Sequence, residues 1–129
     1  MRDIVFKLHF KTPNFKLCPP PLPQLLVWDI NTATCLSSLS GHTSVIYAVS
    51  LSADATTVVS GSYDATVRVW DISAAAATSP TGGQAVCPCI ATLRGHVRAV
   101  RAVTISLDRK MVVSGGDDKT VCVRDKNIP

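Results

Sequence analysis

Apolar residues recur at every second position along much of the chain, which is the pattern that β-strands require. Between Val67 and Trp70, for example, apolar residues alternate with a charged one. Short segments rich in Ser, Asp and Gly, such as residues 50–56, separate these runs and are typical of turns. The pattern therefore predicts strands near residues 35–39, 45–49, 57–60, 67–70, 89–93, 100–105, 111–114 and 120–124.

The strand-like segments belong to an internal repeat. Trp28 and Trp70, each between Val and Asp, stand 42 residues apart, and VVSGSYDATVRVWD recurs as VVSGGDDKTVCVRD. A Gly-His pair precedes each copy, at residues 41–42 and 95–96. The second copy is longer because of an insertion near residues 74–86. That insertion is rich in Ala, Ser, Gly and Pro and is expected to be a flexible loop outside the sheet.

Composition supports a β-fold and excludes several functional classes. Val occurs 16 times, and all nine acidic residues are Asp, which favours strands over helices. With 47% apolar and 17% charged residues the chain has the material for a packed core, yet no apolar run approaches a membrane-spanning length. The net charge of +4 over 129 residues is too small for a dedicated nucleic-acid binder.

The five cysteines do not form a metal or redox motif. Cys87 and Cys89 flank a proline, which gives C-x-C rather than the C-x-x-C of zinc and redox sites. An odd number of cysteines with irregular spacing favours reduced, intracellular thiols. The N-terminus also lacks the continuous apolar stretch of a secretory signal, so we expect the protein in the cytoplasm or nucleus, without metal or cofactor.

The repeated motifs resemble those of the WD40 repeat family. Gly-His, Ser-Gly-x-x-Asp and Trp-Asp occur in this order within residues 25–125, and the resemblance implies an all-β fold, a partial WD40 β-propeller. Residues 45–93 would form one complete four-stranded blade. Parts of two neighbouring blades would come from residues 25–39, with two strands, and residues 100–124, with three.

The repeat domain is assigned to residues 25–129, because residues 1–24 match no repeat and form a separate, Pro-rich segment. One complete blade and parts of two others cannot close a ring. The chain is therefore expected to be part of a longer protein. Open sheet edges and uncovered apolar faces would then require further blades, or else self-association.

Two sets of His, Ser and Asp invite two different interpretations. In WD40 repeats the corresponding side chains form a buried, structural hydrogen-bond chain that ends on Trp, and the resemblance assigns this role here. The alternative is a Ser hydrolase, which would need an exposed Ser beside the His. In the second copy Arg124 replaces the Trp, so that blade is expected to be the looser one. The structural residues are His42, Ser60, Asp64 and Trp70 in the first copy, and His96, Ser114 and Asp118 in the second.

The residues that differ between the two copies are the candidates for binding. In WD40 proteins these positions face one rim of the ring, which is the usual interaction surface, and a mixture of Tyr and Arg is typical of binding hot spots. The resemblance thus implies a non-catalytic scaffold or adaptor that binds protein or peptide partners, with no nucleic acid or membrane. The candidate residues are Tyr47, Tyr63, Arg98, Arg101 and Asp117.

A narrower resemblance suggests an alternative function. The phrases GSYDATVRVWDI, LRGHVRAVRAV and VVSGGDDKTV are similar to the propellers of F-box substrate receptors in ubiquitin ligases. Such receptors bind phosphorylated degrons with rim arginines, and Arg101 falls on one such position. Tyr47 and Tyr63 fall on two others where the receptors carry arginine, and no F-box helices occur in this sequence.

Overall fold

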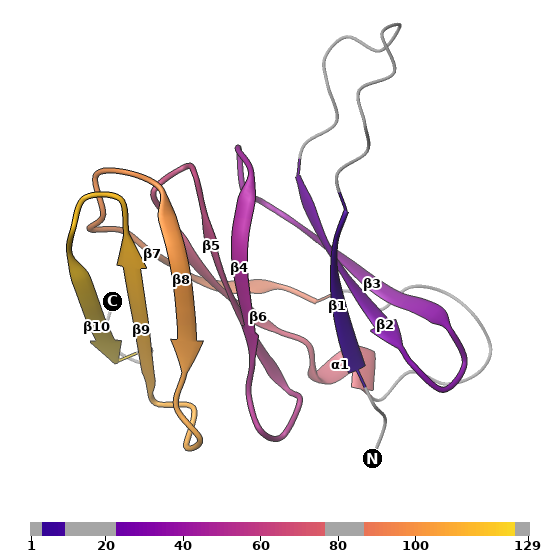
Figure 1. Ribbon diagram of the computed structural model, residues 1–129. Helices are drawn as coiled ribbons and strands as arrows, with labels where there is room; N and C mark the ends of the chain where they lie inside the picture. Colours follow the sequence, from indigo (N-terminus) through magenta and orange to yellow (C-terminus); the bar gives the residue numbers. More distant parts are fainter. Residues whose placement is uncertain (1–3, 10–22, 77–86, 126–129) are drawn as a thin grey trace, which may run out of the picture.

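Three antiparallel β-sheets lie side by side in the computed structural model, which describes residues 4–9, 23–76 and 87–125 (Figure 1). The strand order is β1-β2-β3 in the first sheet, β4-β5-β6-β7 in the second and β10-β9-β8 in the third. No helix in these residues is long and apolar enough to cross a membrane. The elements are β1 (Ile4–His9), β2 (Gln24–Asp29), β3 (Thr34–Ser40), β4 (Ile46–Leu51), β5 (Thr57–Ser62), β6 (Val67–Asp71), α1 (Ser73–Ala76), β7 (Cys89–Leu93), β8 (Val100–Ile105), β9 (Met111–Gly116) and β10 (Val121–Asp125).

The first sheet has one strand more than the repeat supplies. β1, from the N-terminal segment, pairs antiparallel with β2 over its full length, from Ile4 opposite Asp29 to His9 opposite Gln24. The expected partial blade of two strands, residues 25–39, is therefore completed to three by residues that carry no repeat motif. A segment with alternating apolar residues can add a strand wherever an edge is free, because strand pairing uses backbone groups.

The first sheet differs from the second in the residue that stands at the position of Ser60. The register of β1 places Lys7 opposite Leu26, whereas the second sheet has Ser60 opposite Arg68. The Nε1 atom of Trp28 is buried and has no hydrogen-bond partner among the described residues.

The second sheet is the complete blade, and its strand β5 lies between two apolar layers. All six residues of β5 are buried. Val58 belongs to a cluster with residues of the first sheet, whereas Val59 belongs to a cluster with residues of the third. A strand that is covered on both faces reads as a continuous apolar run, and this explains the unbroken segment around residues 57–60.

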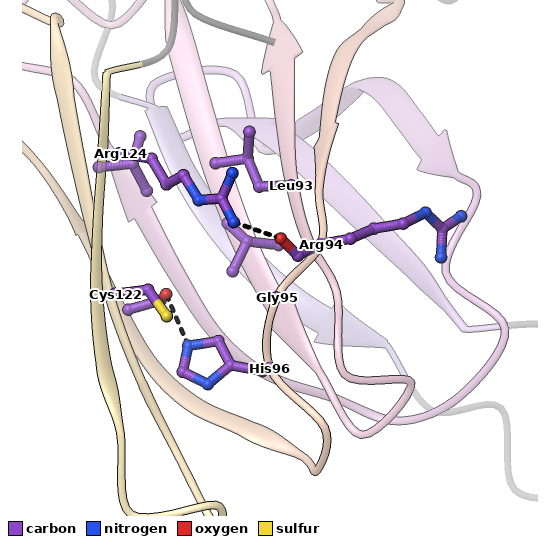
Figure 2. A pocket seen from close by; sticks show the side chains of 9 residues that line it. Leu93, Arg94, Gly95, His96, Cys122 and Arg124 are labelled. Carbon is purple, nitrogen blue, oxygen red and sulfur yellow. Dashed lines mark hydrogen bonds between the residues drawn. The ribbon is translucent and has the colours of Figure 1, made fainter.

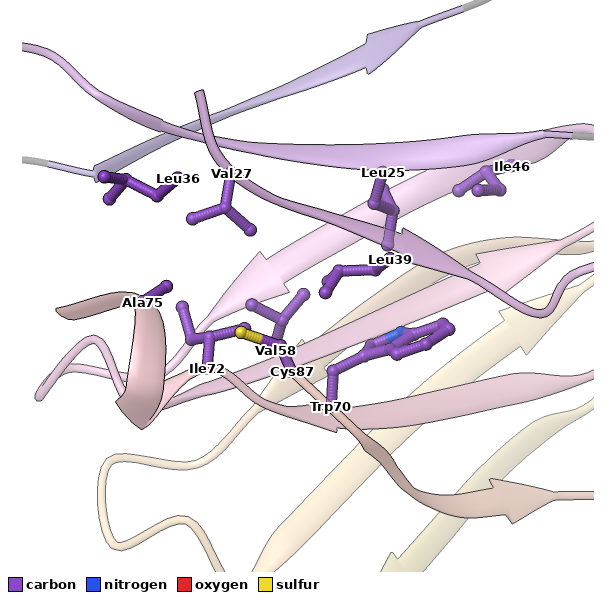
Figure 3. Packing of buried hydrophobic residues seen from close by; sticks show 10 residues of the cluster. All are labelled: Leu25, Val27, Leu36, Leu39, Ile46, Val58, Trp70, Ile72, Ala75 and Cys87. Atoms are coloured by element: carbon purple, nitrogen blue, oxygen red, sulfur yellow. The ribbon is translucent and has the colours of Figure 1, made fainter. Parts of the chain in front are cut away.

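The larger core cluster fills the space between the first two sheets (Figure 3). Trp70 is 2% exposed and lies there with apolar residues of β2 and β3. The smaller cluster joins the second and third sheets through Val59, Val67 and Val69 on one side and Val100 and Val112 on the other. The larger cluster consists of Leu25, Val27, Leu36, Leu39, Ile46, Val58, Trp70, Ile72, Ala75 and Cys87.

The start of the insertion packs against this core. The expectation that residues 74–86 lie outside the fold is wrong at their beginning, because Ser73–Ala76 forms the short helix α1 and Ala75 is fully buried. Alanine is the strongest helix former and is small enough to sit directly on the sheet. The remainder of the insertion, residues 77–86, lies outside the described residues.

Candidate functional site

In the second sheet four side chains form one continuous chain of hydrogen bonds. Trp70 Nε1 donates to Ser60 Oγ over 2.9 Å, and Ser60 Oγ lies 2.7 Å from His42 Nε2. His42 Nδ1 lies 2.9 Å from a carboxylate oxygen of Asp64. The Trp70 N–H can only donate, and the Asp64 carboxylate accepts. Every hydrogen bond in the series therefore has one donor and one acceptor when Ser60 donates to His42 Nε2 and His42 donates from Nδ1. Asp64 also accepts from the main-chain N–H of Thr43, which ties the β3–β4 loop to the β5–β6 turn.

The surroundings keep His42 neutral and Asp64 charged. Burial lowers the pKa of His42 below its usual 6.5, and the hydrogen bond and charge of Asp64 offset this only in part. Burial alone would raise the pKa of Asp64, but hydrogen bonds from Thr66, His42 and Thr43 outweigh it and lower that pKa to about 2. The buried polar groups are thus satisfied in a single protonation state.

We expect stability to fall with acid in two steps. Because the pKa of His42 is lowered on folding, the unfolded state takes up its proton first, and stability declines as the pH drops below about 6.5. The contribution of Asp64 is complete above its ordinary pKa of 3.8 and is lost as the pH falls towards about 2. Melting temperatures measured from pH 8 to about pH 2 would test this, with Asp64→Asn as control. A melting temperature unchanged between pH 7 and pH 5 would contradict the neutral, buried state of His42.

The second copy forms the same chain without its last member. His96 Nδ1 lies 2.9 Å from Asp118, and His96 Nε2 lies 2.9 Å from Ser114 Oγ. Arg124, at the position of Trp70, donates to the carbonyl of Arg94 over 2.6 Å (Figure 2). A cavity of about 10 Å³ remains beside these side chains. The guanidinium thus donates to a main-chain carbonyl, and Ser114 lacks the indole donor that Ser60 has in the first copy.

Burial contradicts the hydrolase interpretation. Ser60 is 0% exposed and Ser114 is 5% exposed. The Ser60 hydroxyl is also held between Trp70 and His42. A nucleophile must reach its substrate, so neither serine can attack one, although the distances to histidine and aspartate resemble those of a catalytic triad. Both sets therefore act as structural ties within their blades.

Two β-bulges place the candidate binding residues at one end of the sheets. In β4 the pairing passes from Ile46 to Ala48, which leaves Tyr47 as the extra residue, and in β8 it passes over Arg101 in the same way. A bulge redirects the side chain of the extra residue. The Arg101 guanidinium lies 4.2 Å from the centre of the Tyr47 ring, and Tyr47 meets the Tyr63 ring edge to face at 6.3 Å.

Arg101 is held by a second contact, with Asp117. Its Nε and one terminal nitrogen donate to the two carboxylate oxygens over 3.0 to 3.1 Å, which is the bidentate geometry of an Arg–carboxylate pair. These hydrogen bonds raise the pKa of Arg101. Four of the five candidate residues, Tyr47, Tyr63, Arg101 and Asp117, therefore form one connected cluster that links the second and third sheets.

A groove of about 650 Å³ lies next to this cluster, between the loops of the second and third sheets. The fifth candidate, Arg98, lines the groove, is exposed and makes no hydrogen bond or ion pair within the described part of the chain. Sequence reasoning missed Val97, which is 81% exposed and stands where the first copy has Thr43. The lining residues are Thr43, Ser44, Tyr63, Asp64, Ala65, Val97, Arg98, Ala99 and Asp117.

No cluster of three or more His, Cys or Asp side chains that could hold a metal ion occurs among the described residues. The cysteines in that part of the chain form no disulfide; they are Cys35, Cys87, Cys89 and Cys122. Cys89 Sγ lies 3.6 Å from a terminal nitrogen of Arg68, inside the second sheet. The arrangement thus offers a groove lined by aromatic, aliphatic and charged side chains, which suits the binding of another molecule.

The arrangement of blades and hydrogen-bond chains is that of a WD-repeat protein. The family model of the WD domain, G-beta repeat, matches residues 33–71 and 87–125. The chain belongs to the WD40 repeat family, and the fold class expected from the repeated motifs is confirmed. Proteins of this family typically serve in protein interaction.

Three curated relatives show how this chain compares with larger proteins. It is 30% identical over 129 residues to mitochondrial division protein 1 of Saccharomyces cerevisiae, a match that covers 92% of this chain and 18% of the relative. It is 31% identical to cell division control protein 4 of the same yeast, covering 80% and 14%, and 33% identical to pre-mRNA-processing factor 19 homolog 2 of Arabidopsis thaliana, covering 78% and 17%. The chain thus spans less than a fifth of the length of each of these relatives.

Proposed function

We propose that this chain is a non-catalytic interaction module that binds a protein segment in the groove between its second and third sheets. The observation that carries the proposal is the cluster of Tyr47, Tyr63 and Arg101 beside an open groove. Tyr and Arg are the residues that most often supply binding energy in protein interfaces. The two bulges and the Arg101–Asp117 pair hold this cluster in place before a partner arrives, which lowers the entropy cost of binding.

The groove favours a segment that carries one apolar and one acidic side chain. Tyr63 is 59% exposed and, with Val97, offers an apolar wall. Arg98 supplies a positive charge that has no counter-ion within the described residues. An aliphatic or aromatic side chain would cover the wall, and a carboxylate would pair with Arg98.

The alternative function, recognition of a phosphorylated degron, makes a different demand on Arg101. Its guanidinium would have to leave Asp117 in order to bind phosphate, because Nε and one terminal nitrogen of Arg101 already donate to the Asp117 carboxylate. Tyr47 and Tyr63 provide no charge at the neighbouring positions. We therefore favour a partner whose binding does not depend on phosphate.

Selection of peptides from a phage-displayed library of linear peptides would test the proposal. We expect the selected peptides to bind the chain in fluorescence polarisation and to lose about tenfold or more in affinity with Tyr63→Ala or Arg98→Ala, since a hot-spot side chain contributes more than about 1.4 kcal/mol. Leu107→Ala is the matched control, because Leu107 is 86% exposed but lies in the turn between β8 and β9, at the other end of the sheets.

The same peptides, synthesised with and without phosphoserine, separate the two functions. If phosphate were required and Arg101→Ala removed the binding, the degron interpretation would replace ours. If Leu107→Ala weakened binding while the groove variants did not, the groove would not be the binding site.

A further inference from the structure

A guanidinium beside the groove is already bound to a carboxylate of the same chain. Nε and one terminal nitrogen of Arg101 donate to the Asp117 carboxylate over 3.0 to 3.1 Å. Both side chains reach the solvent, with 52% of Arg101 and 41% of Asp117 exposed. The fork of an arginine binds a carboxylate or a phosphate in the same bidentate geometry. Without the carboxylate of Asp117, Arg101 would therefore present an open oxyanion site.

Contacts other than the pair with Asp117 also hold the Arg101 side chain in place. The bulge in β8 sets its direction, and the guanidinium lies 4.2 Å from the centre of the Tyr47 ring. The main-chain N–H of Asp117 donates to the carbonyl of Ala99, and this bond does not depend on the side chain at position 117. A change of that side chain should thus free the donors of Arg101 and leave the guanidinium where it is.

The charges around the groove balance as long as Asp117 is present. Asp64, Arg98 and Asp117 line the groove, and Arg101 lies next to it. The charges of the arginines are thus matched by those of the carboxylates. A phosphoserine carries a charge of about −1.5 to −2 at neutral pH. Arg98 can pair with part of that charge, but the rest meets no excess positive charge and lies near the Asp117 carboxylate.

We propose that Asp117 is a specificity-determining residue, whose carboxylate fills the oxyanion site of Arg101 and so makes the groove reject phosphorylated segments. The consequence for the partner rests on the function proposed above, whereas the occupation of Arg101 does not. The first copy has Tyr63 at this position, so the turn does not itself require a carboxylate there. Asparagine at position 117 can accept a hydrogen bond from Arg101 but brings no charge, so the Asp117→Asn variant should gain phosphate binding.

Titration with inorganic phosphate tests the role of Asp117 without any peptide. The Nε–H group of Arg101 gives its own signal in the ¹H–¹⁵N spectrum, which is identified by its loss in Arg101→Lys. At constant ionic strength we expect no saturable shift of this signal in the wild type. In Asp117→Asn we expect a saturable shift that corresponds to at least about tenfold tighter binding, because a charged hydrogen bond is gained. A wild-type signal that responds as strongly as that of the variant, or a variant signal that does not respond, would overturn the proposal.

Asp108→Asn is the matched control for the loss of charge. Asp108 is exposed, lies in the turn between β8 and β9 at the other end of the sheets, and accepts from Ser106 and from the main-chain N–H of Lys110. In this variant the Arg101 signal should remain insensitive to phosphate. A response equal to that of Asp117→Asn would mean that phosphate follows the net charge of the chain, and Asp117 would then have no specific role.

The peptides selected against the groove test the consequence for the partner. Replacing the acidic residue of such a peptide by phosphoserine should weaken its binding to the wild type by about tenfold or more, and Asp117→Asn should remove or reverse this loss. A phosphoserine peptide that binds the wild type as tightly as its acidic parent would refute the exclusion of phosphate. If no peptide is selected at all, the function proposed above fails, and the phosphate titration still decides the role of Asp117.

Discussion

Replacing Trp70 by alanine should lower the free energy of unfolding by about 3–5 kcal/mol, which is typical of a large aromatic residue removed from a core. Trp70 is 2% exposed, belongs to the cluster between the first and second sheets, and donates the last hydrogen bond of the chain through Ser60. The substitution therefore removes apolar packing and leaves the Ser60 hydroxyl with one partner fewer. Urea denaturation followed by circular dichroism would measure the loss.

Trp70→Phe separates the two contributions. Phenylalanine keeps most of the aromatic packing but has no N–H group to donate to Ser60. We expect a loss of stability between those of the wild type and of the alanine variant. If Trp70→Ala changed the free energy of unfolding by no more than an ordinary surface substitution, within about 0.5 kcal/mol, the second sheet would not be organised around this residue.

Replacing Asp64 by alanine should cost about 1–3 kcal/mol, because it leaves buried donors without an acceptor. Asp64 accepts hydrogen bonds from His42 Nδ1, from the main-chain N–H of Thr43 and from Thr66. The loss of this carboxylate would release the β3–β4 loop from the β5–β6 turn. Thermal and urea denaturation of the variant give the size of the effect, and an unchanged melting temperature would refute the structural role of the hydrogen-bond chain.

Asp118→Ala is the matched comparison in the second copy. Asp118 accepts from His96 and from the main-chain N–H of Val97, as Asp64 does from His42 and Thr43. The series of hydrogen bonds that runs from Asp118 through His96, however, ends at Ser114, because no indole donates to that hydroxyl. Arg124 instead donates to the carbonyl of Arg94. We expect a smaller loss of stability than for Asp64→Ala. Equal losses would show that the missing tryptophan does not weaken the third sheet.

Most of the fold could be predicted from the sequence because the repeat motifs are local. The alternation in Cys89–Leu93 and Val100–Ile105 gave the bounds of β7 and β8, and Gly-His, Ser-Gly and Trp-Asp fixed the order of the strands. β1 was a different case. Its alternation is visible, but its pairing with β2 spans a segment without repeat motifs, and pairing through backbone groups leaves no signature in the side chains.

The candidate site could be predicted by position but not by geometry. The bulges at Tyr47 and Arg101 shift the pairing by one residue, so strict alternation along these two strands does not describe the surroundings of either side chain. The bidentate pair joins Arg101 of β8 to Asp117, which lies in the turn after β9. It depends on the tertiary arrangement, as does the exposure of Val97 in the groove.

Mapping a selected peptide on the chain by NMR tests the central claim, that the groove between the second and third sheets is the binding site. Addition of the peptide to the ¹⁵N-labelled chain should shift the amide signals of residues 43–44, 63–65, 97–99 and 117, which line the groove. Signals from the turns at residues 52–56 and 106–110, at the opposite end of the sheets, should stay in place. Shifts confined to those turns, with the groove signals unchanged, would contradict the account.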